Sequence, residues 1–141
     1  MSVTENKKLL QDVFAAMAEG DSRPLIAALA DDVRWTLMGS TPFSRTYEGK
    51  ADVLAKLLGP LQAQIDGRLR LTAQRILAEG DTVVVEARGA SMTRAGLPYN
   101  NGYCMVFRVE GGAVRELTEY MDTALVMATF ARPRGGAGGA A

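Results

Sequence analysis

Hydrophobic residues in the first part of the chain recur with the period of an α-helix. Between residues 3 and 18 apolar side chains lie three or four positions apart, and Gly20 then provides a helix stop. A shorter helical segment follows, with Pro24 in its first turn, where the missing backbone N–H costs least. The pattern predicts two consecutive helices. Their expected buried residues are Leu9, Leu10, Val13, Phe14, Met17, Leu25, Ile26 and Leu29.

Residues 33 to 38 alternate apolar and polar side chains, as a strand with one buried face does, and they include the single tryptophan, Trp35. A loop rich in Ser, Thr and Pro follows over residues 39 to 47, and we expect it to form one rim of a pocket. A third helix is expected to open at Gly49. The dipeptide Gly59-Pro60 should end or kink that helix.

The second half of the chain changes to the two-residue period of strands. Gly80, Gly96 and the pair Gly111-Gly112 mark tight turns between four runs of strand-forming residues. Short turns between consecutive strands indicate a mainly antiparallel sheet. The predicted strands cover residues 69–78, 82–93, 99–109 and 113–122, and residues 123–131 are predicted to form a short closing helix.

The chain has 141 residues, which suits one domain large enough to bury a core. No internal repeat or second domain is visible, so we assign residues 1–132 to a single domain. Residues 133–141 are rich in Gly and Ala and offer nothing that would pack against a core. We predict a flexible tail there.

Composition narrows the classes of function. Lys and Arg together equal Asp and Glu at 16 each, so there is no basic surplus for a phosphate backbone, and we expect no nucleic-acid partner. The polar amino terminus and the lack of a long apolar run indicate a soluble, cytoplasmic protein with no membrane partner. With no histidine and one cysteine, Cys104, the chain excludes histidine-dependent triads and most zinc sites. We expect no metal and no cofactor.

Asp122 is the leading candidate for an acid or base. It follows a run of apolar strand-forming residues, where a carboxylate can face a cavity and shift its pKa. A second interpretation makes Asp122 the N-cap of the closing helix, with its side chain accepting backbone N–H groups. Both roles stay open at this stage.

Strand alternation assigns a binding face to residues 99–109. Tyr103 and Asn101 share the more apolar face, which we expect to point toward the helices and a pocket. Tyr103 would then polarise a ligand oxygen, although a core tyrosine bonded to a backbone carbonyl fits the same pattern. The predicted pocket residues are Trp35, Tyr47, Arg88, Asn101, Met105 and Tyr120; Trp35 also suits a core position, and Arg88 also suits a pair with Glu86 on the outer face.

The order of helix, helix, strand, helix and four-strand meander resembles the nuclear transport factor two-like, or cystatin-like, superfamily. This superfamily includes ketosteroid isomerase, limonene epoxide hydrolase and the SnoaL-like polyketide cyclases. The likeness is carried by the Ala-Asp-Asp segment before Trp35, by Tyr47-Glu48-Gly49, and by the stretch from Gly111 to Thr123. It implies an α+β fold in which a cone-shaped, curved, mainly antiparallel sheet wraps around the N-terminal helices. It also implies an apolar pocket and a homodimer formed through the outer face of the sheet.

Individual members of this superfamily differ from the chain at their catalytic positions. Compared with ketosteroid isomerase, Leu37 stands at the catalytic base, Val13 at the tyrosine of the first helix and Tyr103 at the protonated acid. Compared with limonene epoxide hydrolase, Asp122 and Arg88 match one aspartate and the arginine, but an uncharged pair stands where the second aspartate is expected. The SnoaL-like cyclases resemble the chain more closely, and that resemblance carries over Asp122 as a single acid/base.

Two hypotheses of function follow, since one fold can host several chemistries. In the first, the protein is an isomerase, cyclase or hydrolase-like enzyme that uses Asp122 to move a proton on a small hydrophobic carbonyl or polyketide-like compound. In the second, it is a non-catalytic dimer that binds or sequesters a small apolar molecule.

Overall fold

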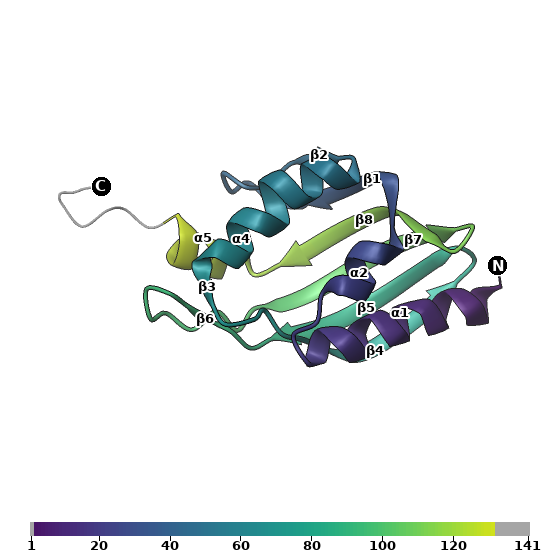
Figure 1. The fold of residues 1–141 in the computed structure, drawn as a ribbon, viewed down its shortest axis with the longest axis horizontal. Helices are drawn as coiled ribbons and strands as arrows, with labels where there is room; N and C mark the ends of the chain where they lie inside the picture. Colours follow the sequence, from purple (N-terminus) through teal and green to yellow (C-terminus); the bar gives the residue numbers. More distant parts are fainter. Residues whose placement is uncertain (1, 132–141) are drawn as a thin grey trace.

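The computed structural model describes residues 2–131 as helices packed on a curved sheet (Figure 1). In chain order, the elements are α1 (Val3–Ala18), α2 (Arg23–Ala28), β1 (Leu29–Leu37), β2 (Thr46–Glu48), α3 (Lys50–Asp52), the π-helix η1 (Val53–Leu58), α4 (Gly59–Gln64), β3 (Ile65–Asp66), β4 (Leu71–Glu79), β5 (Thr82–Gly89), β6 (Met92–Thr93), β7 (Gly102–Glu110), β8 (Ala113–Met121) and α5 (Thr123–Phe130).

The main sheet has six strands in the order β2-β1-β8-β7-β5-β4. The meander from β4 to β8 is antiparallel throughout, as the turn signals predict, whereas β1 runs parallel to β8. Figure 1 shows α1, α2 and α4 lying across one face of this sheet. The predicted α+β fold with a curved, mainly antiparallel sheet is therefore confirmed.

Helix α1 covers the β4 and β5 end of the sheet. It begins with a capping box, in which the Ser2 hydroxyl accepts the Glu5 N–H and the Glu5 side chain accepts the Ser2 N–H. Its apolar stripe packs inward, and the Phe14 ring meets the Phe107 ring edge to face at 6.1 Å between centroids. Burial of this stripe holds the helix on the sheet.

Strands β2 and β3 are absent from the sequence prediction, whereas β6 falls at the end of the predicted strand 82–93. Strand β2 overlaps the end of the predicted loop, and its residues pair with β1, with Tyr47 opposite Trp35. Strands β3 and β6 form a separate two-stranded sheet of two residues each. Segments this short carry too few alternating positions to show a period, and tertiary pairing decides them.

The third helix does not stop at Gly59-Pro60. It runs from α3 through η1 into α4, and the Gly59 N–H donates to the Leu54 carbonyl five residues earlier. A proline ring crowds the backbone of the preceding turn, so a wider π-turn there lets the helix continue past Pro60. A Cβ on residue 59 would lie 2.8 Å from the Leu54 oxygen, which explains why glycine occupies this position.

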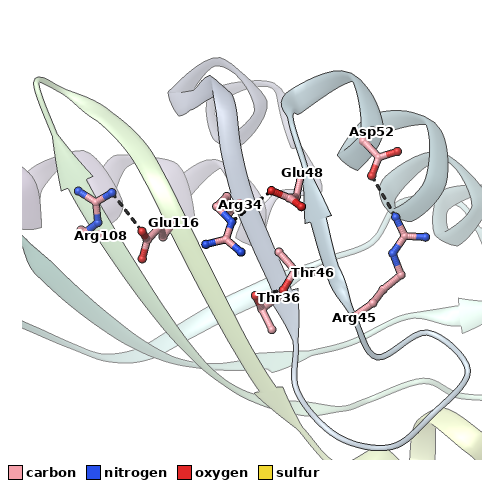
Figure 2. A network of polar contacts seen from close by, with 8 residues as sticks. All are labelled: Arg34, Thr36, Arg45, Thr46, Glu48, Asp52, Arg108 and Glu116. Atoms are coloured by element: carbon pink, nitrogen blue, oxygen red, sulfur yellow. Dashed lines mark hydrogen bonds and ion pairs between the residues drawn. The ribbon is translucent and has the colours of Figure 1, made fainter.

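The outer face of the sheet carries cross-strand polar contacts. Figure 2 shows the ion pairs Arg108–Glu116 and Arg34–Glu48, with N–O distances of 3.2 and 3.4 Å. Next to them, the Thr36 and Thr46 hydroxyls lie 2.8 Å apart. An uncharged row crosses the same face from β4 to β2, made up of Leu77, Val84, Val106, Thr118, Thr36 and Thr46.

The remaining predictions concern the C-terminal tail and the membrane. The predicted flexible tail, residues 133–141, lies outside the described residues. Within residues 2–131, none of the helices combines the length and the apolar character that crossing a bilayer requires.

Candidate functional site

A cavity of about 430 Å³ lies between the inner face of the sheet and the helices. Its wall includes residues of α1, α2, η1, α4 and α5 on one side and of β1, β7 and β8 on the other. Most of the lining is aliphatic or aromatic. This size and character are typical of sites for small organic molecules.

Glu119 places a carboxyl group on the wall of this cavity. Its neighbours across the sheet are Met105 on β7 and Leu37 on β1, which are both apolar. Its side chain accepts one hydrogen bond, from the indole N–H of Trp35 to Oε1, at 3.0 Å. The residue is 8% exposed, and it is the single charged residue buried within residues 2–131.

Burial raises the pKa of Glu119 from 4.5 to about 7, because the apolar surroundings disfavour the charged form. The hydrogen bond from Trp35 acts in the opposite direction and lowers this pKa, although less strongly. Glu119 therefore divides between its protonated and ionised forms near neutral pH. A group with such a pKa can both give and accept a proton, as general acid–base catalysis requires.

Two tyrosines add hydroxyl groups to the same cavity. Burial raises the pKa of Tyr103 and that of Tyr99, and the nearby charge of Glu119 raises both further. Both phenols therefore stay protonated and are available as hydrogen-bond donors. The Tyr99 hydroxyl also accepts a hydrogen bond from Asn101 Nδ2 at 3.2 Å.

Four of the predicted site residues line the cavity, namely Trp35, Tyr47, Tyr103 and Met105. The hydroxyl of Tyr47 donates to the Phe43 carbonyl at 2.8 Å, so this tyrosine fixes the rim loop. Its ring also stacks against the Arg45 guanidinium, 4.3 Å from the ring centroid. The rim loop therefore borders the cavity through Phe43 and Tyr47, and β7 contributes Tyr103 and Met105 to its wall.

Asn101 is fully buried but does not line the cavity. Its Oδ1 accepts the Asp122 N–H at 3.0 Å, and its Nδ2 donates to the Asp122 carbonyl at 3.2 Å. The amide therefore joins the start of β7 to the end of β8. Its contribution to the site is indirect, through the Tyr99 hydroxyl.

Asp122 lies at the N-terminus of α5 and is not among the residues that line the cavity. Its Oδ1 accepts the N–H groups of Ala124 and Leu125 at 3.0 and 3.2 Å. This is the capping alternative that the sequence leaves open. The acid/base candidate supported by the geometry is Glu119, three residues earlier.

Arg88 and Tyr120 lie on the outer face of the sheet, away from the cavity. Arg88 is exposed between the buried residues Ala87 and Gly89, and Tyr120 is 45% exposed. The predicted pair of Arg88 with Glu86 does not form, because Glu86 instead accepts a hydrogen bond from Arg75 at 2.8 Å.

Replacing Asp122 by alanine is expected to destabilise the protein by about 1 kcal/mol, because α5 loses its N-cap. Asp122→Asn should lose much less, since an asparagine oxygen can accept the same two N–H groups. Urea unfolding of the two variants and the wild type measures the difference. Equal losses in both variants would mean that the charge of Asp122, and not its capping geometry, is what matters.

No group of three or more His, Cys, Asp or Glu side chains suited to a metal is found within residues 2–131. A family model of the SnoaL-like domain matches residues 10–117 of the chain. The chain belongs to the SnoaL-like family. The match ends before Glu119 and Asp122, so the family assignment rests on residues 10–117 and not on either carboxylate.

This SnoaL-like protein is similar both to other sequences and to solved structures. An uncharacterised protein of Mycobacterium tuberculosis is 29% identical over 112 residues, which cover 79% of this chain and 85% of the relative. A solved NTF2-like protein of unknown function from Burkholderia pseudomallei is 25% identical, with a TM-score of 0.77 over 94% of this chain and 100% of the other.

An LEH-like epoxide hydrolase from M. tuberculosis has the same fold, with a TM-score of 0.69 and 24% identity over 92% of each chain. At this identity the likeness shows the fold alone. The predicted membership of the NTF2-like and SnoaL-like group is confirmed by these comparisons.

The sequence analysis did not predict Glu119 as a site residue, although it chose Asp122 from the same segment. The pattern that could have revealed it is the alternation of Leu117, Glu119 and Met121, which places an acid in the middle of an apolar face. Glu119 also lies directly opposite Leu37, the residue that the resemblance matches to the catalytic base of ketosteroid isomerase. The carboxyl group thus occupies the adjacent strand at the same level of the sheet.

Proposed function

We propose that this SnoaL-like protein binds a small, largely apolar molecule in the cavity and exchanges a proton with it through Glu119. One observation carries the proposal: a carboxyl group with a pKa of about 7 lies on the wall of a cavity that is otherwise nearly all apolar. Strongly perturbed acids inside clefts are found mostly at functional sites. The apolar lining suits the body of the ligand, and Glu119 suits its polar group.

As an enzyme, the protein would act as an isomerase, cyclase or hydrolase-like catalyst on a carbonyl or polyketide-like compound. The ionised Glu119 would remove a proton, and the protonated form would return it. Tyr103, which stays protonated, would donate a hydrogen bond to the oxygen that becomes negative. In this scheme Glu119 takes the role that the sequence assigns to Asp122, because Asp122 is occupied with α5.

The alternative is a non-catalytic protein that binds or sequesters the same kind of molecule. It is favoured by the absence of a second carboxylate among the described residues that line the cavity. Asn101 is a further candidate for polarising an oxygen, but both its Oδ1 and its Nδ2 form hydrogen bonds with the backbone of Asp122. Binding without turnover is then the outcome.

Trp35 provides the signal that separates the two forms of the proposal. It is the only tryptophan and lines the cavity, so its fluorescence should respond when a ligand binds. A bicyclic ketone such as 2-decalone is a suitable probe, with deuterium uptake beside its carbonyl in heavy water followed by NMR. We expect wild-type protein to exceed Glu119→Gln in this exchange by about a hundredfold or more. Asp122→Asn, the matched control, should exchange like the wild type.

Binding of the ketone without exchange would support the non-catalytic alternative. The cavity-filling variant Leu57→Trp should abolish the fluorescence response, since Leu57 is a partly buried residue of the cavity wall. A response that survives this variant would place the ketone elsewhere and overturn the proposal.

We also propose a homodimer through the outer face of the sheet. Support comes from the uncharged row that crosses this face and from the exposed hydrophobic side chains of Leu77 and Tyr120, at 54% and 45%. Sedimentation equilibrium should give twice the chain mass, and a monomer would overturn this part. The cytoplasmic location stays a prediction.

A further inference from the structure

We infer that the ligand of the cavity is an organic cation, an amine with apolar substituents whose ammonium group pairs with Glu119. This inference rests on the ligand-binding part of the proposed function and specifies the chemical class of the molecule. A Glu119 paired with an ammonium group serves binding and not proton transfer, so the inference goes with the non-catalytic form. It is carried by the charges that surround the cavity and by its aromatic wall.

The first argument is that Glu119 has no positively charged partner among residues 2–131. The indole N–H of Trp35 is the one hydrogen bond found for its carboxyl group within residues 2–131. A buried carboxyl group either stays protonated through a raised pKa or is paired with a cation, because an isolated charge in apolar surroundings costs a large amount of free energy. An ammonium group brought by a ligand would supply the missing partner and would take up the space that the cavity leaves beside Glu119.

The second argument is that the described part of the cavity wall places no free cation near Glu119 with which an anionic ligand could pair. Among the described residues Lys56 is the one basic residue of the cavity wall, but its Nζ lies 2.9 Å from Asp52 Oδ1 and its side chain is 61% exposed. No basic group therefore faces Glu119 from the wall, and a carboxylate or phosphate ligand would meet a like charge. The remaining titratable groups of the wall are the phenols Tyr47, Tyr99 and Tyr103, whose pKa values burial raises.

The third argument is the aromatic wall. Six of the nine aromatic residues of the chain line the cavity: Trp35, Phe43, Tyr47, Tyr99, Tyr103 and Phe130. Aromatic rings attract cations through their quadrupole, and combinations of rings with a carboxylate suit amines and quaternary ammonium groups. The Tyr47 ring already holds the Arg45 guanidinium in this way, at 4.3 Å.

The inference predicts how the affinity for an amine changes with pH, because binding releases the proton of Glu119. When an ammonium ion enters while Glu119 is protonated, the carboxyl releases its proton to solvent and the ion pair forms. Below the pKa of Glu119 each binding event therefore releases one proton, and affinity should rise about tenfold for each pH unit. Above about pH 7 the carboxyl is already ionised, so affinity should level off. Alkyl ammonium ions keep their charge throughout this range.

Three probes of one shape test the ligand class: 4-phenylbutylamine, 4-phenylbutanol and 4-phenylbutanoate. Their affinities can be measured by titration calorimetry at about pH 6 and about pH 8, in buffers of different ionisation enthalpy that reveal released protons. We expect the amine to bind roughly tenfold to a hundredfold more tightly than the alcohol at the higher pH, and the acid to bind most weakly. Glu119→Gln should bring the amine to the level of the alcohol. Glu116→Gln, an acid of the outer face, should leave all three affinities unchanged.

The outcomes separate this inference from the proposed function. If the alcohol or the acid binds as tightly as the amine and Leu57→Trp blocks it, the ligand cavity stands but the cationic class is wrong. If none of the three binds, both the cavity function and the ligand class are overturned. Amine binding whose affinity is independent of pH and of Glu119→Gln would also contradict the inference.

Discussion

Glu119→Gln is expected to stabilise the protein by about 3 kcal/mol above pH 7 and to leave its stability nearly unchanged near pH 4.5. Burial raises the pKa of Glu119 from 4.5 to about 7 in the folded state, whereas the unfolded chain exposes the side chain and restores the lower value. Between these pH values the folded protein binds the extra proton, so its stability falls as pH rises. Above about pH 7 the fold carries the whole cost of a buried charge.

Glutamine removes that cost while keeping the local structure. Its amide oxygen can still accept the Trp35 indole N–H, and its NH₂ group can turn toward the cavity. Urea unfolding of wild type and variant across this pH range gives the two stability curves. We expect them to coincide in acid and to separate as the pH approaches 7, with a constant gap beyond.

The control for this experiment is Glu116→Gln on the same strand. Glu116 is on the outer face, where its side chain is 49% exposed and pairs with Arg108. The difference between this variant and the wild type should be small and show no midpoint near pH 7. Parallel curves for Glu119→Gln and the wild type would show that Glu119 keeps an ordinary pKa, and the acid/base proposal would lose its basis.

Local signals were sufficient to predict most of the fold. The apolar stripe of α1, the proline at the start of α2 and the glycine turns of the meander each act within a few residues of chain. The start of β1 and the short strand β2 could not be predicted in this way. The start of β1 pairs with β8 more than eighty residues away, and β2 pairs with β1, and no local pattern records either pairing.

A bulge in β8 decides which residues near its end face the cavity. Val114 is buried, and strict alternation from it would turn residues 116, 118, 120 and 122 inward. The pairing shifts between Arg108 and Val109, where Val114 faces Val109 but Glu116 faces Arg108, so β8 has one extra residue. That residue reverses the alternation and turns Leu117 and Glu119 inward instead.

The predicted residues that line the cavity lie in strand segments whose alternation no bulge interrupts. Tyr103 and Met105 follow the uninterrupted alternation of β7, and Trp35 follows that of the second part of β1. Arg88 was assigned to the pocket through the resemblance to an epoxide hydrolase, although its own strand turns it outward. Where the pattern of the chain and the resemblance disagreed, the pattern gave the correct face.

Trp35→Phe is expected to raise the pKa of Glu119 above about 7 and to lower the stability of the fold by roughly 2 kcal/mol where Glu119 is ionised. The variant keeps an aromatic ring in the wall but removes the indole N–H that Glu119 accepts at 3.0 Å. That hydrogen bond favours the charged form and is the one contribution that opposes burial. NMR titration of the Glu119 side-chain carbon, labelled with carbon-13, measures the midpoint directly.

Tyr47→Phe is the matched control for Trp35→Phe. It also removes a polar group from an aromatic residue of the wall, but its hydroxyl bonds to Phe43 and not to Glu119. The Glu119 midpoint should therefore stay near 7 in this variant and rise only in Trp35→Phe. An unchanged midpoint in both would mean that Trp35 has no part in tuning the carboxyl. A raised midpoint in Trp35→Phe should also move the pH at which amine affinity levels off by the same amount, because one protonation governs both measurements.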